Sequence, residues 1–384
     1  MLPELKNFLK NKRCTLLGAG PMSLNCVDSV IELSDKFNVP IILIASRRQI
    51  DSEYFGGGYV NNWDTKNFSK YIKTKNKKKK VILARDHGGP WQNNLEIDQK
   101  LSIKQAMESA KKSFAEDIDS NFKILHIDPS IDIFNKSKPD QILERVYELL
   151  DFCYTYASKK NKKIEIEVGT EEQNGSTNTP DELIETLTKL NKFCKKNKFP
   201  KISFVVIQAG TKVMENRNIG SFESPVRVSN ELPVEIQLPK MIEICEKFGV
   251  LMKEHNTDYL SNDSLKWHPK LGIHAANVAP EFGVEETKAF IQLLKNNKLN
   301  KELDDFINIS VKSNKWKKWV INKNMVNDQF KTLLCGHYIF SSEEFFEIKK
   351  RVNSKIKKSL DIDDYLKQHI KISIKRYLSN FNLI

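Results

Sequence analysis

Short runs of aliphatic and β-branched residues recur along the chain, separated by segments with a helical pattern. One such segment carries Ile103, Ala106, Met107, Ala110 and Phe114, whose spacings of three, four and seven place them on one helix face. Strand and helix therefore alternate, which predicts a parallel sheet, and eight βα units most simply close into a TIM (β/α)8 barrel. The eight strand-forming runs are residues 14–20, 41–46, 81–87, 124–130, 164–172, 203–210, 251–259 and 271–280.

After Pro280 the pattern is helical to the end of the chain, through Trp316 and Trp319 and a lysine-rich tail. Part of this region supplies the eighth helix, and the rest is expected to pack on the barrel. No Gly/Ser-rich linker separates an independent domain. The sequence thus predicts a barrel over residues 1–300 and a helical extension over 301–384. The seventh and eighth runs lie close together, so the helix between them, near residues 263–267, should be short.

Composition excludes several classes of function. The 384 residues are 40% hydrophobic and 29% charged, and no apolar run approaches the ~20 residues of a membrane span. The N-terminus lacks the apolar core of a signal peptide, and the six cysteines form no CxxC pair, so a cytoplasmic protein with reduced core cysteines is expected.

The net charge of +13 raises the question of nucleic-acid binding. The lysines cluster at residues 73–80, 159–163 and 192–201, each just before a strand-forming run, which in a barrel is the face opposite the chemistry. Aromatic residues are not interleaved with these clusters as a base-stacking surface would require. A solvated lysine-rich face is therefore expected, without nucleic acid as a partner.

Polar residues gather at the C-terminal ends of the runs, where a barrel places its active site. Histidines and carboxylates that meet on one rim suit a divalent ion, zinc first, with manganese or magnesium as alternatives. The residues are Asp86, His87, His126, Asp128, Glu165, Glu167, Glu171, Glu172, Gln208, Glu254, His255, Asp258, His274 and Asn277.

These candidates differ in weight. His87 and His255 each end an apolar run beside an acid and before a turn, whereas His126 and His274 have the pattern of hydrogen-bonded core histidines. Glu165 and Glu167 share one strand face by period two. Because an unpaired buried carboxylate is costly, a partner such as a metal or a base is expected for them.

A competing motif follows the first strand. Gly18-Ala19-Gly20-Pro21-Met22-Ser23, with Arg47-Arg48 after the second strand, resembles a nicotinamide dinucleotide fold with a 2′-phosphate clamp. A serine replaces the third glycine, however, and a proline follows the second. An NADP-dependent dehydrogenase is therefore the minor alternative.

Several segments together resemble the Z-type subunit of tagatose-1,6-bisphosphate aldolase and its relatives, in register over most of the chain. They are Phe55-Gly56-Gly57-Gly58-Tyr59, Asp86-His87-Gly88-Gly89-Pro90, Ile124-Leu125-His126-Ile127-Asp128-Pro129-Ser130, Val168-Gly169-Thr170-Glu171, Val206-Ile207-Gln208-Ala209-Gly210 and His255-Asn256-Thr257-Asp258-Tyr259.

That family is similar to the class II, zinc-dependent aldolases, and the resemblance implies their barrel fold and a metal site. It implies that Asp86 is the acid/base and that His87 and His255 bind the metal. Gln208 stands where those aldolases have a third histidine, so Glu167 is a second candidate for that position, as ligand or as base. The resemblance also implies two functions. Z-type subunits were first regarded as non-catalytic partners of an aldolase, and relatives are metal-dependent ketose 4-epimerases.

The chain departs from the family at substrate-facing positions. Arg47, Arg48 and Gln49 follow the second strand where the family has a different motif, and Asn277 lies in a changed eighth strand. A guanidinium group binds a carboxylate or phosphate in bidentate fashion, so an acidic or phosphorylated substrate is expected. These four, with Asp128, Glu171 and Asp258, are the predicted substrate-binding residues.

The predicted function is epimerisation at C4 of such a ketose by retro-aldol cleavage and aldol re-addition, with residues 211–225 as a lid that retains the fragment. The alternatives are an aldolase that releases the fragments and a stabilising subunit without activity. The expected partners are a sugar or sugar-phosphate substrate and either further copies of the chain or an aldolase subunit.

Overall fold

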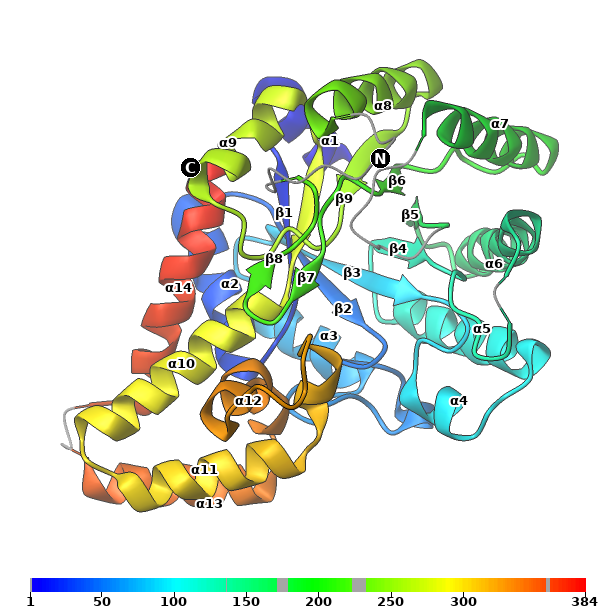
Figure 1. Ribbon diagram of the computed structural model, residues 1–384. Helices are drawn as coiled ribbons and strands as arrows, with labels where there is room; N and C mark the ends of the chain where they lie inside the picture. The colour runs from blue at the N-terminus through cyan, green and yellow to red at the C-terminus, as the bar shows by residue number, and fades with distance from the viewer. Residues whose placement is uncertain (1, 136, 171–178, 223–232, 357–359) are drawn as a thin grey trace.

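Eight parallel strands close into a barrel in this computed structural model, which describes residues 2–135, 137–170, 179–222, 233–356 and 360–384. The order around the barrel is β1-β10-β9-β6-β5-β4-β3-β2 (Figure 1). Each strand coincides with one of the predicted runs, with β3 extending one residue beyond its run, so the predicted fold class is confirmed. The strands are β1 (Leu16–Ala19), β2 (Ile41–Ser46), β3 (Val81–Gly88), β4 (Ile124–Ile127), β5 (Glu165–Val168), β6 (Phe204–Ile207), β9 (Leu251–Glu254) and β10 (Ala275–Val278).

Helices surround the barrel and bury its apolar outer face. The helix between the seventh and eighth barrel strands is indeed short: α9 spans Asn262–Leu271. The others are α1 (Pro3–Asn11), α2 (Leu24–Phe37), η1 (Glu53–Phe55), α3 (Thr65–Lys75), α4 (Asn94–Asp98), α5 (Ile103–Asp119), α6 (Pro139–Lys159), α7 (Pro180–Lys196), α8 (Val234–Phe248) and α10 (Pro280–Asn296).

An irregularity in β3 positions part of the site. The register between β3 and β4 is continuous up to Arg85 and shifts before Gly88. His87, which lies between them, has φ of 45°, a left-handed conformation that residues with a side chain seldom adopt. The shift turns the end of β3 away from the regular ladder and brings Asp86 and His87 to the mouth of the barrel.

The C-terminal region forms a helical layer beside the barrel mouth. Its elements are α11 (Asn300–Lys312), η2 (Lys315–Lys318), α12 (Asp328–Cys335), η3 (Gly336–Ile339), α13 (Glu343–Lys355) and α14 (Ile362–Asn380). Phe290 of α10, Phe306 and Phe345 form the centre of a second apolar cluster, with ring centroids 5.0–5.8 Å apart. This cluster joins the extension to the last barrel helix.

Helix α14 returns to the barrel and packs between α2 and α10 (Figure 1). Tyr377 and Arg376 both hydrogen-bond the carboxylate of Glu281 at the start of α10. The backbone N–H of Thr15 donates to the carbonyl of Phe381 at 3.0 Å. The last helix therefore completes the wall beside the first strand.

A small hairpin after β6 was not predicted. Its strands are β7 (Val213–Met214) and β8 (Arg217–Asn218), and the backbone N–H of Glu215 in the turn donates to the carbonyl of Trp319 at 2.8 Å. The segment after β6 is thus tied to the extension. The expected lid, residues 211–225, includes this hairpin, and its last three residues lie outside the described part of the chain.

The remaining expectations concern charge, cysteines and membranes. The lysine clusters follow α3, α6 and α7 and precede β3, β5 and β6, so they lie at the N-terminal ends of the strands. All six cysteines are buried and unpaired. Among the described residues, no helix combines the length and apolarity that crossing a membrane requires.

Candidate metal centre

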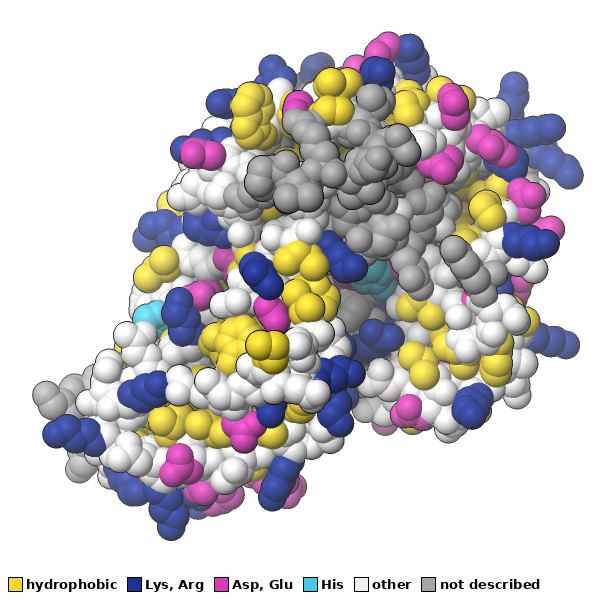
Figure 2. All heavy atoms as spheres, in the orientation of Figure 1, with side chains coloured by type: hydrophobic (Ala, Val, Ile, Leu, Met, Phe, Trp, Pro, Cys, Tyr) yellow, Lys and Arg dark blue, Asp and Glu magenta, His cyan; other side chains and the backbone are white. Residues whose placement is uncertain are grey.

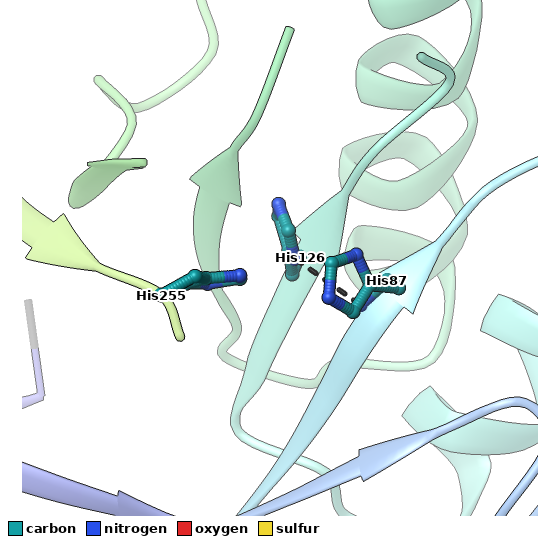
Figure 3. Close-up of side chains that lie close together, drawn as sticks. All are labelled: His87, His126 and His255. Carbon is teal, nitrogen blue, oxygen red and sulfur yellow. Dashed lines mark hydrogen bonds between the residues drawn. The ribbon is translucent and has the colours of Figure 1, made fainter. Parts of the chain in front are cut away.

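Three histidines from different strands meet at the mouth of the barrel. His87 lies near the end of β3, His126 on β4, and His255 directly after β9. Their ring centroids are 5.0–5.4 Å apart, and Figure 3 shows the three rings turned toward one another. The pattern of buried strands alone had favoured a core role for His126. Its position between β3 and β5 in the barrel places it with the other two instead.

Two carboxylates share this space. Asp86 Oδ1 lies 3.6 Å from His126 Nδ1 and 3.9 Å from His255 Nε2. Glu167 Oε1 lies 3.1 Å from His255 Nε2 and 3.8 Å from His126 Nδ1. Among the described residues, the three histidines form one group and Asp86, His126, Glu167 and His255 another, each with potential ligand atoms within 4.8 Å of one another.

Neighbouring groups fix the orientation of His87 and His126. His87 Nδ1 hydrogen-bonds Asp128 Oδ2 at 2.6 Å, which leaves Nε2 facing Asp86 Oδ2 at 3.7 Å. His126 Nδ1 accepts the backbone N–H of His87 at 3.1 Å. A Cβ atom on Gly169 would lie 2.6 Å from His126 Nε2, so only glycine leaves room for the ring. The carboxylate contact of His87 is typical of histidines that bind metals, whereas the backbone N–H of His87 occupies the lone pair of His126 Nδ1, the ring nitrogen that lies near Asp86 and Glu167.

Lys253 is a buried member of the site that the sequence analysis missed. Its Nζ lies 2.6 Å from Glu167 Oε2, and both side chains are buried. The alternation of side chains along a strand could have revealed it, because Lys253 and His255 are two residues apart and therefore lie on the same face of β9. The lysine holds one oxygen of Glu167 and leaves the other toward the histidines.

The charges of the cluster suit a cation. Burial alone would raise the pKa of Glu167, but the positive charge of Lys253 and the nearby histidines lower it to about 2. The histidines likewise hold the pKa of Asp86 well below its usual range. Burial lowers the pKa of His255 to about 4, so this ring is neutral at pH 7 and has a lone pair to donate.

His87 behaves differently from His255. Burial disfavours its charged form, but the carboxylates of Asp86 and Asp128 outweigh this effect and raise the pKa of His87 to about 9. Without a metal, the ring is therefore protonated at neutral pH, and metal binding would release that proton. Imidazole and carboxylate donors in this number fit zinc, and also manganese.

A cavity of about 560 Å³ opens above the cluster. Asp86, His87 and His255 form part of its floor, whereas Glu167 and His126 lie behind this lining. The C-terminal extension contributes further lining residues, which are Asn314, Lys315, Lys317, Lys318, Trp319 and Tyr338. The volume is that of a small-molecule site.

Arg47 is not among the residues that line this cavity, so its role in substrate binding stays a prediction that this geometry does not support. Its guanidinium is buried and fully used, because Nε pairs with Asp51 at 2.8 Å and Nη1 with Glu96 at 2.5 Å. The remaining nitrogen donates to Ser109. Arg48, the next residue, does line the cavity. Gln49 lines it too, with its Oε1 accepting the N–H of Ser46.

The other predicted substrate-binding residues line the cavity but have structural partners. Asp128 accepts hydrogen bonds on both oxygens, from His87 and from Ser130 among others. Asp258 Oδ1 accepts the backbone N–H groups of Ala279 and Glu281 and so caps α10, and burial raises its pKa to about 8. Asn277 donates to Asp86 Oδ1 at 3.2 Å, and its own Oδ1 has no hydrogen-bond partner.

Two candidates lie elsewhere, and two others fall outside the described residues. Gln208 follows β6 and lines a second cavity, between α6 and α7, so its assignment as a metal ligand stays a prediction. Glu171, with Glu172, lies outside the described residues. His274 was expected at a strand end, but it precedes β10, and its Nδ1 accepts the backbone N–H of Met252. It therefore lies at the opposite end of the barrel from the cluster.

The glycines after β1 serve the barrel and not a dinucleotide fold. A Cβ atom on Gly18 would lie 2.2 Å from Asn277 Oδ1, and one on Gly20 would lie 2.4 Å from the Cβ of Ala279. Both glycines allow β1 to approach β10 where the barrel closes. Because the sheet is a closed barrel, the alternative of a dinucleotide-binding open sheet is wrong.

No protein-family model matches this chain, and a search of curated proteins found no match. Solved structures share the fold at low sequence identity. One, of a probable tagatose 6-phosphate kinase from Sinorhizobium meliloti 1021, is 13% identical, with a TM-score of 0.75, and the match covers 95% of this chain and 100% of that one.

Two further structures are of a fructuronate-tagaturonate epimerase from Cohnella laeviribosi and a fructose-bisphosphate aldolase from Campylobacter jejuni. Both are 13% identical to this chain. The epimerase has a TM-score of 0.58, with coverage of 97% of this chain and 82% of that one. The aldolase has a TM-score of 0.53, with coverage of 100% and 94%. The chain thus has a barrel fold in common with aldolase and epimerase structures.

Proposed function

We propose that this protein is a divalent-metal-dependent carbohydrate enzyme that epimerises a phosphorylated or acidic ketose at C4. One observation carries the proposal: three histidines and two carboxylates converge at the C-terminal ends of the barrel strands, where Asp86, His87 and His255 line a cavity. The fold shared with aldolase and epimerase structures supports it, as does the resemblance to the Z-type subunit family.

His87 and His255 would hold the ion, with Glu167 as a further ligand, and His126 would join them once its Nδ1 releases the backbone N–H of His87. Zinc fits this donor set best, and manganese or magnesium are the alternatives. Once bound, the ion would supply a Lewis acid for the oxygens at C2 and C3 of the ketose.

Asp86 is the better candidate for the proton-transfer group. It lines the cavity, whereas Glu167 is fully buried and paired with Lys253. Asp86 would accept the proton of the C4 hydroxyl as the C3–C4 bond breaks, so that C4 becomes an aldehyde and the bonding electrons remain with the C1–C3 fragment. Asn277, which donates to Asp86 Oδ1, would hold the carboxylate in place.

Epimerisation follows if the aldehyde rotates and C3 adds to its other face, with the proton returned from Asp86 to the C4 oxygen. If the aldehyde leaves the cavity instead, the same residues perform aldol cleavage. The extension lines the cavity, and the β7–β8 hairpin is hydrogen-bonded to the lining residues Trp319 and Asn256, so both would favour retention of the fragment.

The first test is metal analysis of protein purified without chelator. One equivalent of metal is expected in the wild type, and less than a tenth of that in His87→Ala and His255→Ala. His369→Ala, on α14, is the matched control and should keep its metal. A wild type without metal under these conditions would contradict the proposal.

The second test is mass analysis of products from a panel of ketose phosphates and ketouronates. An isomer of unchanged mass supports epimerisation, and two smaller fragments support cleavage. A metal-loaded protein that converts none of them, but stabilises an aldolase subunit, would support the non-catalytic alternative. Binding to such a subunit, or to further copies of the chain, can be measured by light scattering.

A further inference from the structure

Four cationic side chains line the cavity above the histidines. Arg48 lies inside the cavity, and three lysines of η2, Lys315, Lys317 and Lys318, stand at its rim. Figure 2 shows Lys and Arg side chains around the hollow in the middle of this face, with a histidine side chain visible within it. Residues far apart in the sequence thus place four positive charges in the lining of one small cavity.

Arg48 is the most buried of these four cationic residues. Its Nε is buried and has no hydrogen-bond partner, in contrast to Arg47, whose nitrogens are all used. Burial lowers the pKa of Arg48, since water cannot solvate the charge fully. No ion pair joins Arg48 to a carboxylate within the described residues. A partly buried guanidinium without an anionic partner costs free energy. Binding sites carry such a cost in the free protein, because an anionic ligand offsets it on binding.

The three lysines belong to a segment that is held in place. Trp316 is buried and donates from Nε1 to the carbonyl of Val311 at 3.1 Å. Trp319 donates from Nε1 to the hydroxyl of Tyr338 at 3.2 Å. The ammonium of Lys318 lies over the Trp319 ring, 4.5 Å from its centroid. The lysines are exposed, and across the described ranges none of the three has a carboxylate partner, so their charges are available to a ligand.

We propose that Arg48, Lys315, Lys317 and Lys318 form a subsite for the anionic end of the substrate, and that this end is a phosphate monoester. Four unpaired cations suit a dianion better than the single charge of a carboxylate, which one arginine can neutralise. The inference rests on the proposed function in one respect: the reacting carbons of the substrate would lie in the same cavity, beside His87 and His255. The phosphate would then lie at the end of the sugar remote from the bond that breaks.

Calorimetric titration with inorganic phosphate tests the subsite without any reaction. Wild-type protein should bind one phosphate, and Arg48→Gln should bind it about tenfold more weakly because a charge-assisted hydrogen bond is lost. The triple variant K315Q/K317Q/K318Q should show a similar loss. The matched control K73Q/K75Q/K77Q removes the same charge from the opposite end of the barrel and should bind phosphate as the wild type does.

Two further arms separate this inference from the proposed function. Phosphate should still bind to His87→Ala, because the subsite does not include the histidine cluster. Acetate should bind more weakly than phosphate to the wild type, and the reverse order would overturn the phosphate assignment in favour of a carboxylate. Binding that depends on His87 but not on Arg48 would overturn the subsite. Phosphate binding as expected, with no sugar converted, would keep the subsite and contradict the proposed reaction.

Discussion

The buried pair of Lys253 and Glu167 yields a quantitative prediction. In Lys253→Met, an apolar side chain of similar length replaces the ammonium 2.6 Å from Glu167 Oε2, and a buried carboxylate loses its main positive partner. The pKa of Glu167 in the folded protein is about 2, against an ordinary value of 4.5. By linkage, this difference corresponds to a stabilisation on the order of 3 kcal/mol at neutral pH, which Lys253, as the largest favourable partner, shares with His126 and His255. Measured costs of breaking a buried pair are similar, about 3–5 kcal/mol.

The dependence of this stabilisation on pH has a definite sign. Because the folded-state pKa of Glu167 is lowered, the stabilisation is present above about pH 4.5 and is lost as the pH falls toward 2. The difference between wild type and Lys253→Met should therefore be largest at neutral pH and shrink in acid.

Urea unfolding with chelator present, followed by circular dichroism, measures the free energy of unfolding without a contribution from metal. Lys253→Met should lose about 3 kcal/mol at pH 7. The double variant K253M/E167Q should lose less than the single one, because the uncompensated charge is gone. A loss below about 1 kcal/mol in Lys253→Met, or a double variant as unstable as the single one, would refute the reasoning.

Three other substitutions test separate parts of the site. Asp128→Asn should weaken metal binding about 10–100-fold, measured by competition with a chromogenic chelator, because His87 loses the carboxylate that orients it. Arg47→Met should lower the free energy of unfolding in urea by about 3–5 kcal/mol, since it leaves Asp51 and its neighbours unpaired, and a stability change within 1 kcal/mol would speak against that role. Asp86→Asn should retain metal but lower kcat about 100-fold or more on whichever ketose the wild type converts, and unchanged turnover would exclude it as the proton-transfer group.

The alternation of strands and helices could be predicted because the two kinds of element differ in their apolar pattern. Strands appear as short continuous apolar runs, and helices as apolar residues spaced three or four apart. The eight strands of the barrel were found in this way, as was the short helix α9. The β7–β8 hairpin escaped because its strands are two residues long, too short for a period to be visible. Its anchor is a backbone hydrogen bond to the distant Trp319, which leaves no mark in the local sequence.

The site could be predicted in part. His87 and His255 stood out because acids and turns follow apolar runs there, and the structure places their rings 5.2 Å apart. His126 has no such local mark, and only its place beside β3 in the closed barrel brings it to the cluster. Arg47 and Arg48 are neighbours in the sequence, but Arg47 is paired inside the protein and Arg48 lines the cavity. The turn after β2 breaks the period of two, so the pattern could not say which one faces the cavity.

The contact between Thr15 and Phe381 has a consequence for the order of folding. One edge of strand β1 pairs with β2, the next strand in the sequence, whereas its other side meets β10 and the turn after α14, which are distant in the sequence. Contacts between distant segments carry a larger loop-closure cost than contacts between adjacent ones, so closure of the barrel between β1 and β10 is expected to be a late and slow step. Until that step, β1 keeps one apolar strand edge without its partner, and the folding intermediate is expected to be prone to aggregation.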